Sequence, residues 1–497
     1  MELKFQDKQI SCLQQLDCRE QIQEQSQEVR LGENMPDIGR VLCSWGQVLL
    51  RGKEWHGSIV GVSGGVMTWT MYEPEEGGNP RTVESWIPFS QKWELSDSKS
   101  DGEIQCSMLL KSVDARSTSA RKMVVRAAVS VETEIMAYGQ INLYEPQNLP
   151  EDVQLLQHTY PVKMPREAGE KAFDLDEILD IPVSTASPAQ LVYYSLQPEI
   201  ADQKVMTDKV VFRGTAQLHM LYRSEEGTLN FWDTEIPFSQ YSDLEREHEV
   251  DSEASISPCV TSLELEQDEN GTLHLKAGFV GQYVIYDTEN ICSMEDIYSY
   301  KRNIEPIVEN IQIPAILDTQ SSPLAAESHV SLEGSRIADL SFNPDRPAVR
   351  KEDTGVQVET AGYFQVLYWD LEGKLQCSTQ YWSSSQNIPA DSECQVRSML
   401  APSGRPRGNL NGGQGDFSSD MNARTVTWIC QGIPVISGLE MGEPEVRKGP
   451  SLIISKTGES SLWQLAKESG STVDAIKTLN HLEEEPEGDR ILLIPVL

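Results

Sequence analysis

The sequence contains no run of about 18 apolar residues, the length that a transmembrane helix requires. Residues 1–7 also lack the apolar stretch and cleavage site of a signal peptide. Basic residues are scarce, because 41 lysines and arginines stand against 77 aspartates and glutamates and leave a formal net charge of −36. A charge of this sign repels nucleic acid and anionic lipid. The sequence therefore predicts a cytoplasmic protein with no membrane span and no nucleic-acid partner.

Metal-binding patterns are absent as well. The nine cysteines include no Cys-x-x-Cys pair, and the seven histidines include no His-x-x-x-His spacing. Zinc sites and disulfide frameworks usually show regular spacing of this kind. Scattered thiols are typical of a reducing compartment. We therefore expect reduced cysteines, no disulfide framework and no bound metal.

Motifs of enzyme chemistry are nearly absent. No Gly-x-x-x-x-Gly-Lys phosphate loop occurs. Residues 61–65 match Gly-x-Ser-x-Gly around Ser63, but the nucleophile elbow of hydrolases needs a helix after the serine. The following residues, 66–72, are patterned as a strand instead. We therefore expect a non-enzymatic protein with no catalytic residue and no cofactor.

Alternating apolar and polar residues dominate the chain up to about residue 445 and predict β-strands. The clearest hairpin joins 263–266 to 273–276 across Asn270-Gly271, a pair typical of two-residue type I′ turns. The glutamine-rich run 14–28 fits either a short helix or an edge strand. The segment 401–420 is rich in Gly, Pro, Ser and Asn and predicts a flexible loop.

A repeat of about 150 residues organises these strands. The pentapeptide at 87–91, Ile-Pro-Phe-Ser-Gln, recurs unchanged at 236–240, and a Leu-Tyr pair at 221–222 recurs at 367–368. In the third copy, Ile388-Pro389 is taken as the counterpart of the Ile-Pro pair. A period this long indicates domains rather than a solenoid. We predict a mainly β fold of three repeated antiparallel sandwich-like or barrel-like domains, each with its own core.

The repeat gives the expected domain boundaries. They are residues 1–146, 147–309 and 310–445 for the three β domains, with the third domain the most divergent. A linker at 446–450 leads to a C-terminal module at 451–497.

The C-terminal module combines two strands and two helices. Apolar strands are expected at 452–454 and 491–495, and helical spacing of apolar residues occurs at 462–466 and 473–479. Ser471 followed by Asp474 predicts the N-terminal capping box of the second helix. This order resembles a LysM domain, a small βααβ fold. The resemblance implies binding of N-acetylglucosamine polymers, such as peptidoglycan or chitin, or of a protein partner.

The whole arrangement, three β repeats followed by a LysM-like module, resembles the SipL-like spore coat proteins of endospore-forming bacteria, whose repeats are called SPOCS domains. The resemblance implies a mother-cell protein located at the forespore surface during sporulation. It also implies that the module binds the SpoIVA-type ATPase of the coat basement layer. Peptidoglycan or chitin binding is the alternative.

The resemblance places a binding groove between the loop after the first strand of the module and the loop before the last strand. Four acidic residues within 483–487 favour a basic surface on a protein ligand, or else form a solvated loop. Trp463 is predicted to pack in or near the core of the module rather than to stack on a sugar. The groove residues are Gly458, Glu459, Ser460, Ser461, Leu462, Asn480, His481, Leu482, Pro486 and Gly488.

Overall fold

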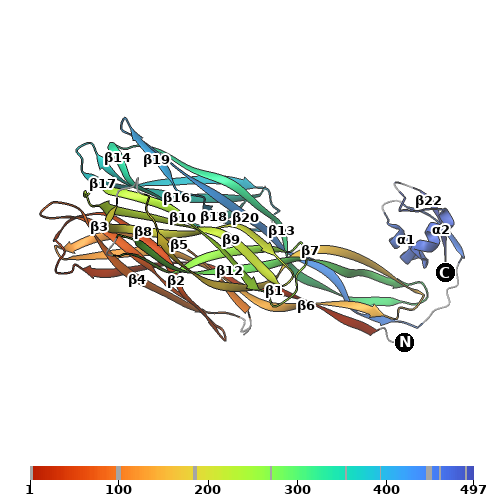
Figure 1. Cartoon of the computed structure of the whole chain (residues 1–497). Helices are drawn as coiled ribbons and strands as arrows, with labels where there is room; N and C mark the ends of the chain where they lie inside the picture. Colours follow the sequence, from red (N-terminus) through yellow and green to blue (C-terminus); the bar gives the residue numbers. More distant parts are fainter. Residues whose placement is uncertain are drawn as a thin grey trace.

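The structure, a computed structural model, consists almost entirely of β-strands. Figure 1 shows an elongated body of long strands and, beyond one end of it, a small unit with two short helices. No helix in the described part of the chain is long and apolar enough to cross a membrane. The described residues are 4–96, 102–182, 187–268, 271–352, 355–391, 393–443, 450–457, 460–486, 488 and 490–497.

The body comprises three units, each with two antiparallel sheets. In the first unit, one sheet contains β1 (Lys4–Arg30), β6 (Lys122–Gln147) and β5 (Gly102–Ser119), and the other contains β2 (Ile38–His56), β3 (Ile59–Pro74) and β4 (Arg81–Glu94). The second unit contains β7 (Val153–Leu179), β12 (Leu273–Ser299) and β11 (Glu253–Gln267), then β8 (Pro188–Val205), β9 (Lys209–Ser224) and β10 (Leu229–Asp243). The third contains β13 (Ile304–Ser331), β20 (Gln414–Met441), β18 (Gln395–Pro402) and β19 (Arg407–Asn411), then β14 (Gly334–Pro344), β16 (Gly355–Asp370), β17 (Leu375–Ile388) and β15 (Ala348–Glu352).

In every unit the first long strand pairs with the last, the strands that follow the first (β2–β4, β8–β10 and β14–β17) form a separate sheet, and those just before the last (β5, β11, and β18 with β19) pair with the last strand. The predicted fold class, mainly β with antiparallel sheets and two short helices near the C-terminus, is confirmed. The expected boundary after residue 146 falls one residue before the end of β6, whereas the boundary after residue 309 falls inside β13. Most of the expected linker, residues 446–449, lies outside the described residues.

The repeated pentapeptide occupies the same register in the first two units. Phe89 of β4 lies opposite Gly64 of β3, and Phe238 of β10 lies opposite Gly214 of β9. A Cβ atom at Gly64 would be 2.7 Å from the Phe89 ring, and one at Gly214 would be 2.8 Å from the Phe238 ring. The phenylalanine therefore covers a glycine on the neighbouring strand, which explains why both residues recur.

The third unit departs from this pattern. In β17 the register position of the pentapeptide begins at Trp382, which lies opposite Gly362, whereas Ile388 lies at the end of the strand opposite Val356. The predicted correspondence of Ile388-Pro389 with the Ile-Pro pair is therefore wrong. The register position of Gly64 and Gly214 is occupied in β16 by Thr360, which lies opposite Ser384 of β17, so the packing of phenylalanine over glycine does not recur in the third unit.

Substitution of Gly214 by alanine is expected to destabilise the body by about 1–3 kcal/mol, because the added Cβ would lie 2.0 Å from the Glu199 carbonyl oxygen. Urea unfolding followed by circular dichroism measures the effect. Gly32→Ala is the control, since no atom lies within 4 Å of a Cβ at Gly32. Equal stability of the two variants would contradict the close packing described for β9.

Three local predictions are settled by the structure. The run 14–28 is part of β1, an edge strand. The 263–276 hairpin forms, with Gln267 opposite Leu273, while Asn270 of the predicted type I′ turn lies outside the described residues. The predicted flexible loop at 401–420 is wrong. It contains β19 and the start of β20, joined by Gly412-Gly413 with positive φ at both residues, the requirement of a type I′ turn.

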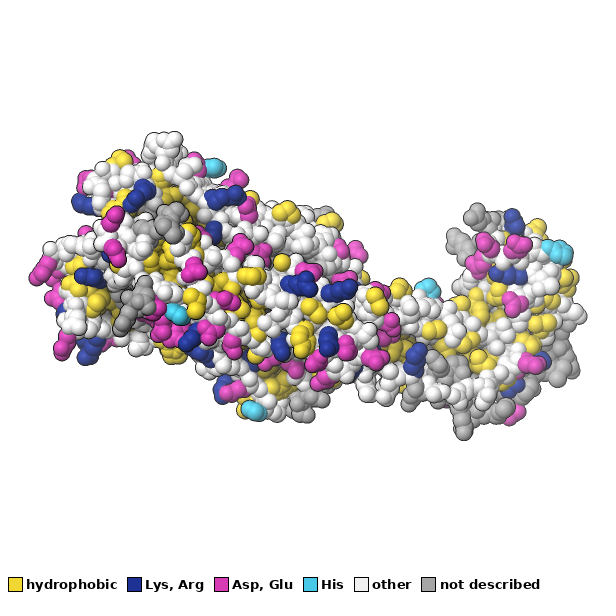
Figure 2. All heavy atoms as spheres, viewed as in Figure 1, with side chains coloured by type: hydrophobic (Ala, Val, Ile, Leu, Met, Phe, Trp, Pro, Cys, Tyr) yellow, Lys and Arg dark blue, Asp and Glu magenta, His cyan; other side chains and the backbone are white. Residues whose placement is uncertain are grey.

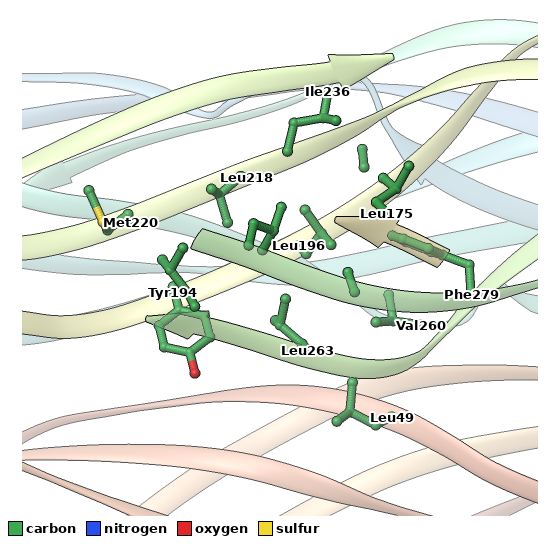
Figure 3. Packing of buried hydrophobic residues seen from close by; sticks show 14 of the residues in the cluster. Leu49, Leu175, Tyr194, Leu196, Leu218, Met220, Ile236, Val260, Leu263 and Phe279 are labelled. Carbon is green, nitrogen blue, oxygen red and sulfur yellow. The ribbon is translucent and has the colours of Figure 1, made fainter. Parts of the chain in front are cut away.

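The hydrophobic cores extend across the units, contrary to the expectation of one core per domain. The largest core belongs mainly to the second unit but includes Leu49 and Trp69 of the first unit and Leu367 of the third. Figure 3 shows Leu49 directed at Val260 and Leu263 of β11. Three pairs of long strands, β1 with β6, β7 with β12 and β13 with β20, share a further core, which we call the three-hairpin core although the paired strands are not consecutive in sequence. It contains Ile10, Cys12, Ile141, Leu143, Val162, Met164, Ile291, Ile313, Ala315, Ile433 and Val435.

Two cysteines join the first unit to the third. Cys43 of β2 and Cys377 of β17 form a disulfide with their Cα atoms 5.8 Å apart. The expectation that all cysteines are reduced is therefore wrong for this pair. The two residues are 334 positions apart in sequence and meet because β2 packs near β17. The spacing of cysteines in the sequence therefore could not predict this disulfide.

Partly buried ion pairs also join the first and third units. Arg397 of β18 lies 2.5 Å from Glu134 and 3.3 Å from Glu132, both on β6, and Arg346 donates to Glu132 as well. Burial lowers the pKa of Arg397, but the carboxylates of Glu134 and Glu132 outweigh it and raise that pKa above its ordinary value. The guanidinium thus stays charged where it bridges the units.

A histidine between two carboxylates joins the second and third units at the side of a cleft of about 950 Å³. His219 of β9 lies 2.7 Å from Asp233 of β10 and 2.9 Å from Asp339 of β14, and Arg405 lies 3.0 Å from Asp233. Burial lowers the pKa of His219, but Asp339 and Asp233 outweigh it and raise that pKa.

The raised pKa of His219 predicts a loss of stability in alkali. A group whose folded-state pKa exceeds its unfolded value of about 6.5 stabilises the fold fully below that pH and loses its contribution as pH rises through the folded-state pKa. We expect the free energy of unfolding in urea to fall as pH rises above about 6.5, and to fall less in His219→Gln. An unchanged pH dependence in the variant would contradict the assignment.

Candidate docking site

The C-terminal module has the predicted order of elements. It comprises β21 (Leu452–Lys456), α1 (Leu462–Ser469), α2 (Val473–Asn480) and β22 (Ile491–Pro495), and the two strands pair antiparallel. The helices pack over one face of this small sheet. Their common core contains Leu462, Leu465, Ala466, Ile476, Leu492 and Ile494.

The helix ends are fixed by side-chain caps. The Ser461 hydroxyl accepts from Gln464 N at 3.2 Å, and the Gln464 side chain accepts from Ser461 N, so a capping box starts α1. At α2 the cap is Thr472, which accepts from Ala475 N at 3.1 Å. The predicted capping box at Ser471 and Asp474 is therefore wrong by one residue, and Ser471 is fully buried.

Several of the predicted groove residues hold the module together. Leu462 is buried in the core, and its backbone N–H donates to Glu485 Oε1 at 3.0 Å. The Asn480 amide donates to Leu493 O at 2.6 Å and accepts from Leu493 N at 2.8 Å. Leu482 packs against the core, half-buried. These contacts bring the loop after β21 close to the loop before β22.

The remaining groove residues lie at the surface of these loops. Ser460 and His481 are exposed, and His481 ends α2 with a left-handed φ of 52°. Gly488 is exposed and its carbonyl accepts from the Thr457 hydroxyl at 2.9 Å, while Pro486 is half-buried. Gly458 and Glu459 lie outside the described residues.

The module contacts the body at the end of β12 through four residues, which we call the clasp: Asp296, Tyr298, Trp463 and Lys467. Trp463 Nε1 donates to Asp296 Oδ2 at 2.7 Å, and Lys467 Nζ lies 2.7 Å from Asp296 Oδ1. The rings of Tyr298 and Trp463 meet edge to face at 4.8 Å, and Tyr298 OH donates to Ser471 O at 3.0 Å. Trp463 is thus a packing residue, as predicted, but its ring packs against the second unit.

The clasp has a defined charge state. Burial raises the pKa of the Tyr298 phenol to about 12, and the nearby Asp296 carboxylate acts in the same direction. The phenol therefore remains protonated and can donate to Ser471 O at physiological pH. Lys467 in the last turn of α1 also faces the negative end of the helix dipole, which favours a cation there.

Residues far apart in sequence form this contact, and the sequence pattern did not predict it. Asp296 and Trp463 are 167 positions apart, and Asp296 belongs to a long strand with no local motif.

Figure 2 shows acidic and basic side chains interspersed over the visible face of the body, so the excess of acidic residues forms no single patch on that face.

Residues 189–266 match the family model described as SipL, SPOCS domain. The matched segment covers β8 to β10 and nearly all of β11, so the second unit is similar to a SPOCS domain over the meander and one strand of the other sheet. The first unit has the same strand order as the second, and the third pairs β14, β16, β17 and β18 in a corresponding way but contains two additional short strands, β15 and β19. Neither a curated protein nor a solved structure matches the chain.

Proposed function

We propose that this chain is a non-enzymatic structural protein of endospore formation, built from three SPOCS-like units and a C-terminal LysM domain. The match of 189–266 to a SPOCS domain is the observation that supports this assignment most directly. The identical strand order of the first unit and the corresponding strand pairing of the third, which adds β15 and β19, support extending the assignment to both. The βααβ order of the module supports its assignment as a LysM domain.

The LysM domain would act as a docking head for the SpoIVA-type ATPase of the coat basement layer. The protein would then tether this layer to the forespore surface from the mother-cell cytoplasm. The body would serve as a scaffold, because its units share cores, ion pairs and a disulfide that hold them in one arrangement. The hydrolase alternative is not favoured, since Ser63 lies within β3 with no helix directly after it and its hydroxyl donates to Gly52 O at 3.5 Å.

Two contacts favour a protein ligand over a glycan. Glycan recognition in the groove would depend on free backbone groups, yet the Leu462 N–H is already bonded to Glu485. The Asn480 amide is likewise engaged with β22. The exposed carboxylates of Glu483 and Glu484 add charge that suits a basic surface on a protein. Binding of N-acetylglucosamine polymers is the second candidate, since contacts of Leu462 with Glu485 and of Thr457 with Gly488 bring the described parts of the two loops together.

Affinity purification from sporulating cells tests the proposal. The full-length chain is expected to retain the coat ATPase, and a chain that ends at residue 450 is expected to lose it. Both chains are then incubated with purified peptidoglycan. Retention of the full-length chain on peptidoglycan, without recovery of the ATPase, would contradict the docking function and favour the glycan alternative.

A further inference from the structure

The small sheet of the module has an exposed apolar outer face. The register pairs Leu452 with Pro495, Ile454 with Leu493, and Lys456 with Ile491. Because side chains alternate along a strand, the residues between them point inward to the core. We call the outer apolar side chains the strip, and their exposed fractions are 47% for Leu452, 70% for Ile454, 71% for Ile491 and 38% for Leu493.

The strip lies on the side of the sheet opposite the helices. Leu492 and Ile494, which alternate with strip residues, pack against α1 and α2 in the core of the module. The helices also supply Trp463 and Lys467, the residues of the module that bond to Asp296 of β12. Docking of the module on the body therefore uses the helical side and leaves the strip exposed.

The two edges of the sheet differ. On β22, the Asn480 side chain bonds to both the N–H and the C=O of Leu493, which closes that edge. On β21, Thr457 N donates to Arg490 O, and Val496 N donates to Ser451 O. Since hydrogen-bonded pairs alternate in an antiparallel ladder, Leu452 and Ile454 direct their N–H and C=O groups away from β22. In the described part of the chain no strand pairs with this edge of β21.

We propose that an extended segment of a partner protein adds to the open edge of β21 as a third strand and covers the strip with alternating apolar side chains. This proposal rests on the proposed docking function and specifies the surface that performs it. An open edge supplies main-chain hydrogen bonds, and the exposed alternate side chains supply selectivity, which is the usual mode of strand addition. The five residues of β21 set the length of the partner segment at about five residues.

Other occupants fit less well. An anionic lipid surface is disfavoured by the net charge of −36. A polysaccharide is also disfavoured, because the large apolar side chains of Ile454 and Ile491 would then lie against a polar ligand and not against an apolar surface. An extended protein segment satisfies both the apolar strip and the free backbone groups of Leu452 and Ile454.

Two substitutions in the full-length protein separate the contributions of the edge and of the strip. Ile454→Pro removes an edge N–H that β22 does not use, and Ile454→Glu places a charge in the middle of the strip. Leu479→Glu is the matched control, since Leu479 is an exposed leucine (41%) on α2 and outside the strip. The probe is the purified SpoIVA-type ATPase, with affinity measured by biolayer interferometry. Circular dichroism confirms the fold of each variant.

We expect both Ile454 variants to weaken binding at least tenfold and Leu479→Glu to bind like the unmodified chain. Hydrogen–deuterium exchange of the unmodified protein should show that binding slows exchange at Leu452 and Ile454. Unchanged binding by both Ile454 variants, or no slowing of exchange in β21, would overturn the edge proposal while leaving the docking function intact. Failure of the unmodified chain to bind would overturn both. Self-association that the Ile454 variants abolish would assign the edge to a second copy and overturn the partner assignment.

Discussion

Replacement of Arg397 by methionine is expected to destabilise the folded body by about 3–5 kcal/mol. The substitution removes the guanidinium but leaves the carboxylates of Glu132 and Glu134 partly buried at the junction of the first and third units. Removing one partner of a buried ion pair exposes the full desolvation penalty of the other. The loss should be visible as a lower midpoint in urea unfolding at pH 7.

The control for this experiment is Arg407→Met. Arg407 forms an ion pair with Asp420 at 2.5 Å, but the two side chains are 72% and 54% exposed. Solvent and salt screen such a pair, so the substitution should change stability by no more than about 1 kcal/mol. Similar losses for the two variants would show that the Arg397 pairs do not hold the units together.

Tyr298→Ala is expected to release the module from the end of β12. The substitution removes a buried ring that packs on Trp463 and the hydroxyl that donates to Ser471 O. Truncation of a buried aromatic side chain typically costs about 3 kcal/mol or more, which would lower the ratio of docked to free module by roughly a hundredfold. Small-angle X-ray scattering should show a larger radius of gyration, while the unfolding midpoint of the body stays unchanged.

Two further variants define the contribution of the clasp. Tyr298→Phe keeps the ring and loses only the hydrogen bond to Ser471, so it should release the module far less. Tyr300→Ala changes a neighbouring tyrosine whose hydroxyl bonds to Glu151 O within the second unit, and it should leave the module docked. Release by Tyr300→Ala to the same extent as by Tyr298→Ala would contradict the described contact.

The sequence predicted those features that depend on local patterns. Alternation gave the β class, and the pentapeptide revealed the repeat because Phe89 and Phe238 perform the same packing over glycine. Helical spacing gave α1 and α2 in the module. The cap of α2 was misplaced by one residue because Ser471 and Thr472 are both good caps, and only the structure shows that Ser471 is buried.

The features that the sequence did not predict are contacts between distant segments. Arg397 and Glu134 lie 263 positions apart, and Asp296 and Trp463 lie 167 positions apart. No periodicity relates such residues, because their contact depends on how whole sheets pack. The groove residues show the same limit. Leu462 and Asn480 were identified by resemblance as ligand contacts, whereas the structure engages them within the module.

The three-hairpin core has a consequence for the synthesis of the protein. It joins Ile10, near the start of the chain, to Ile433 and Val435, near the end of β20. A ribosome releases the first unit long before the strands that complete this core have been made. Contacts between residues so distant in sequence slow folding, and apolar surface that stays exposed in the meantime favours aggregation. β1 and β6 can pair with each other once the first unit has been made, but their side chains in this core, such as Ile10 and Ile141, remain exposed until β13 and β20 have followed.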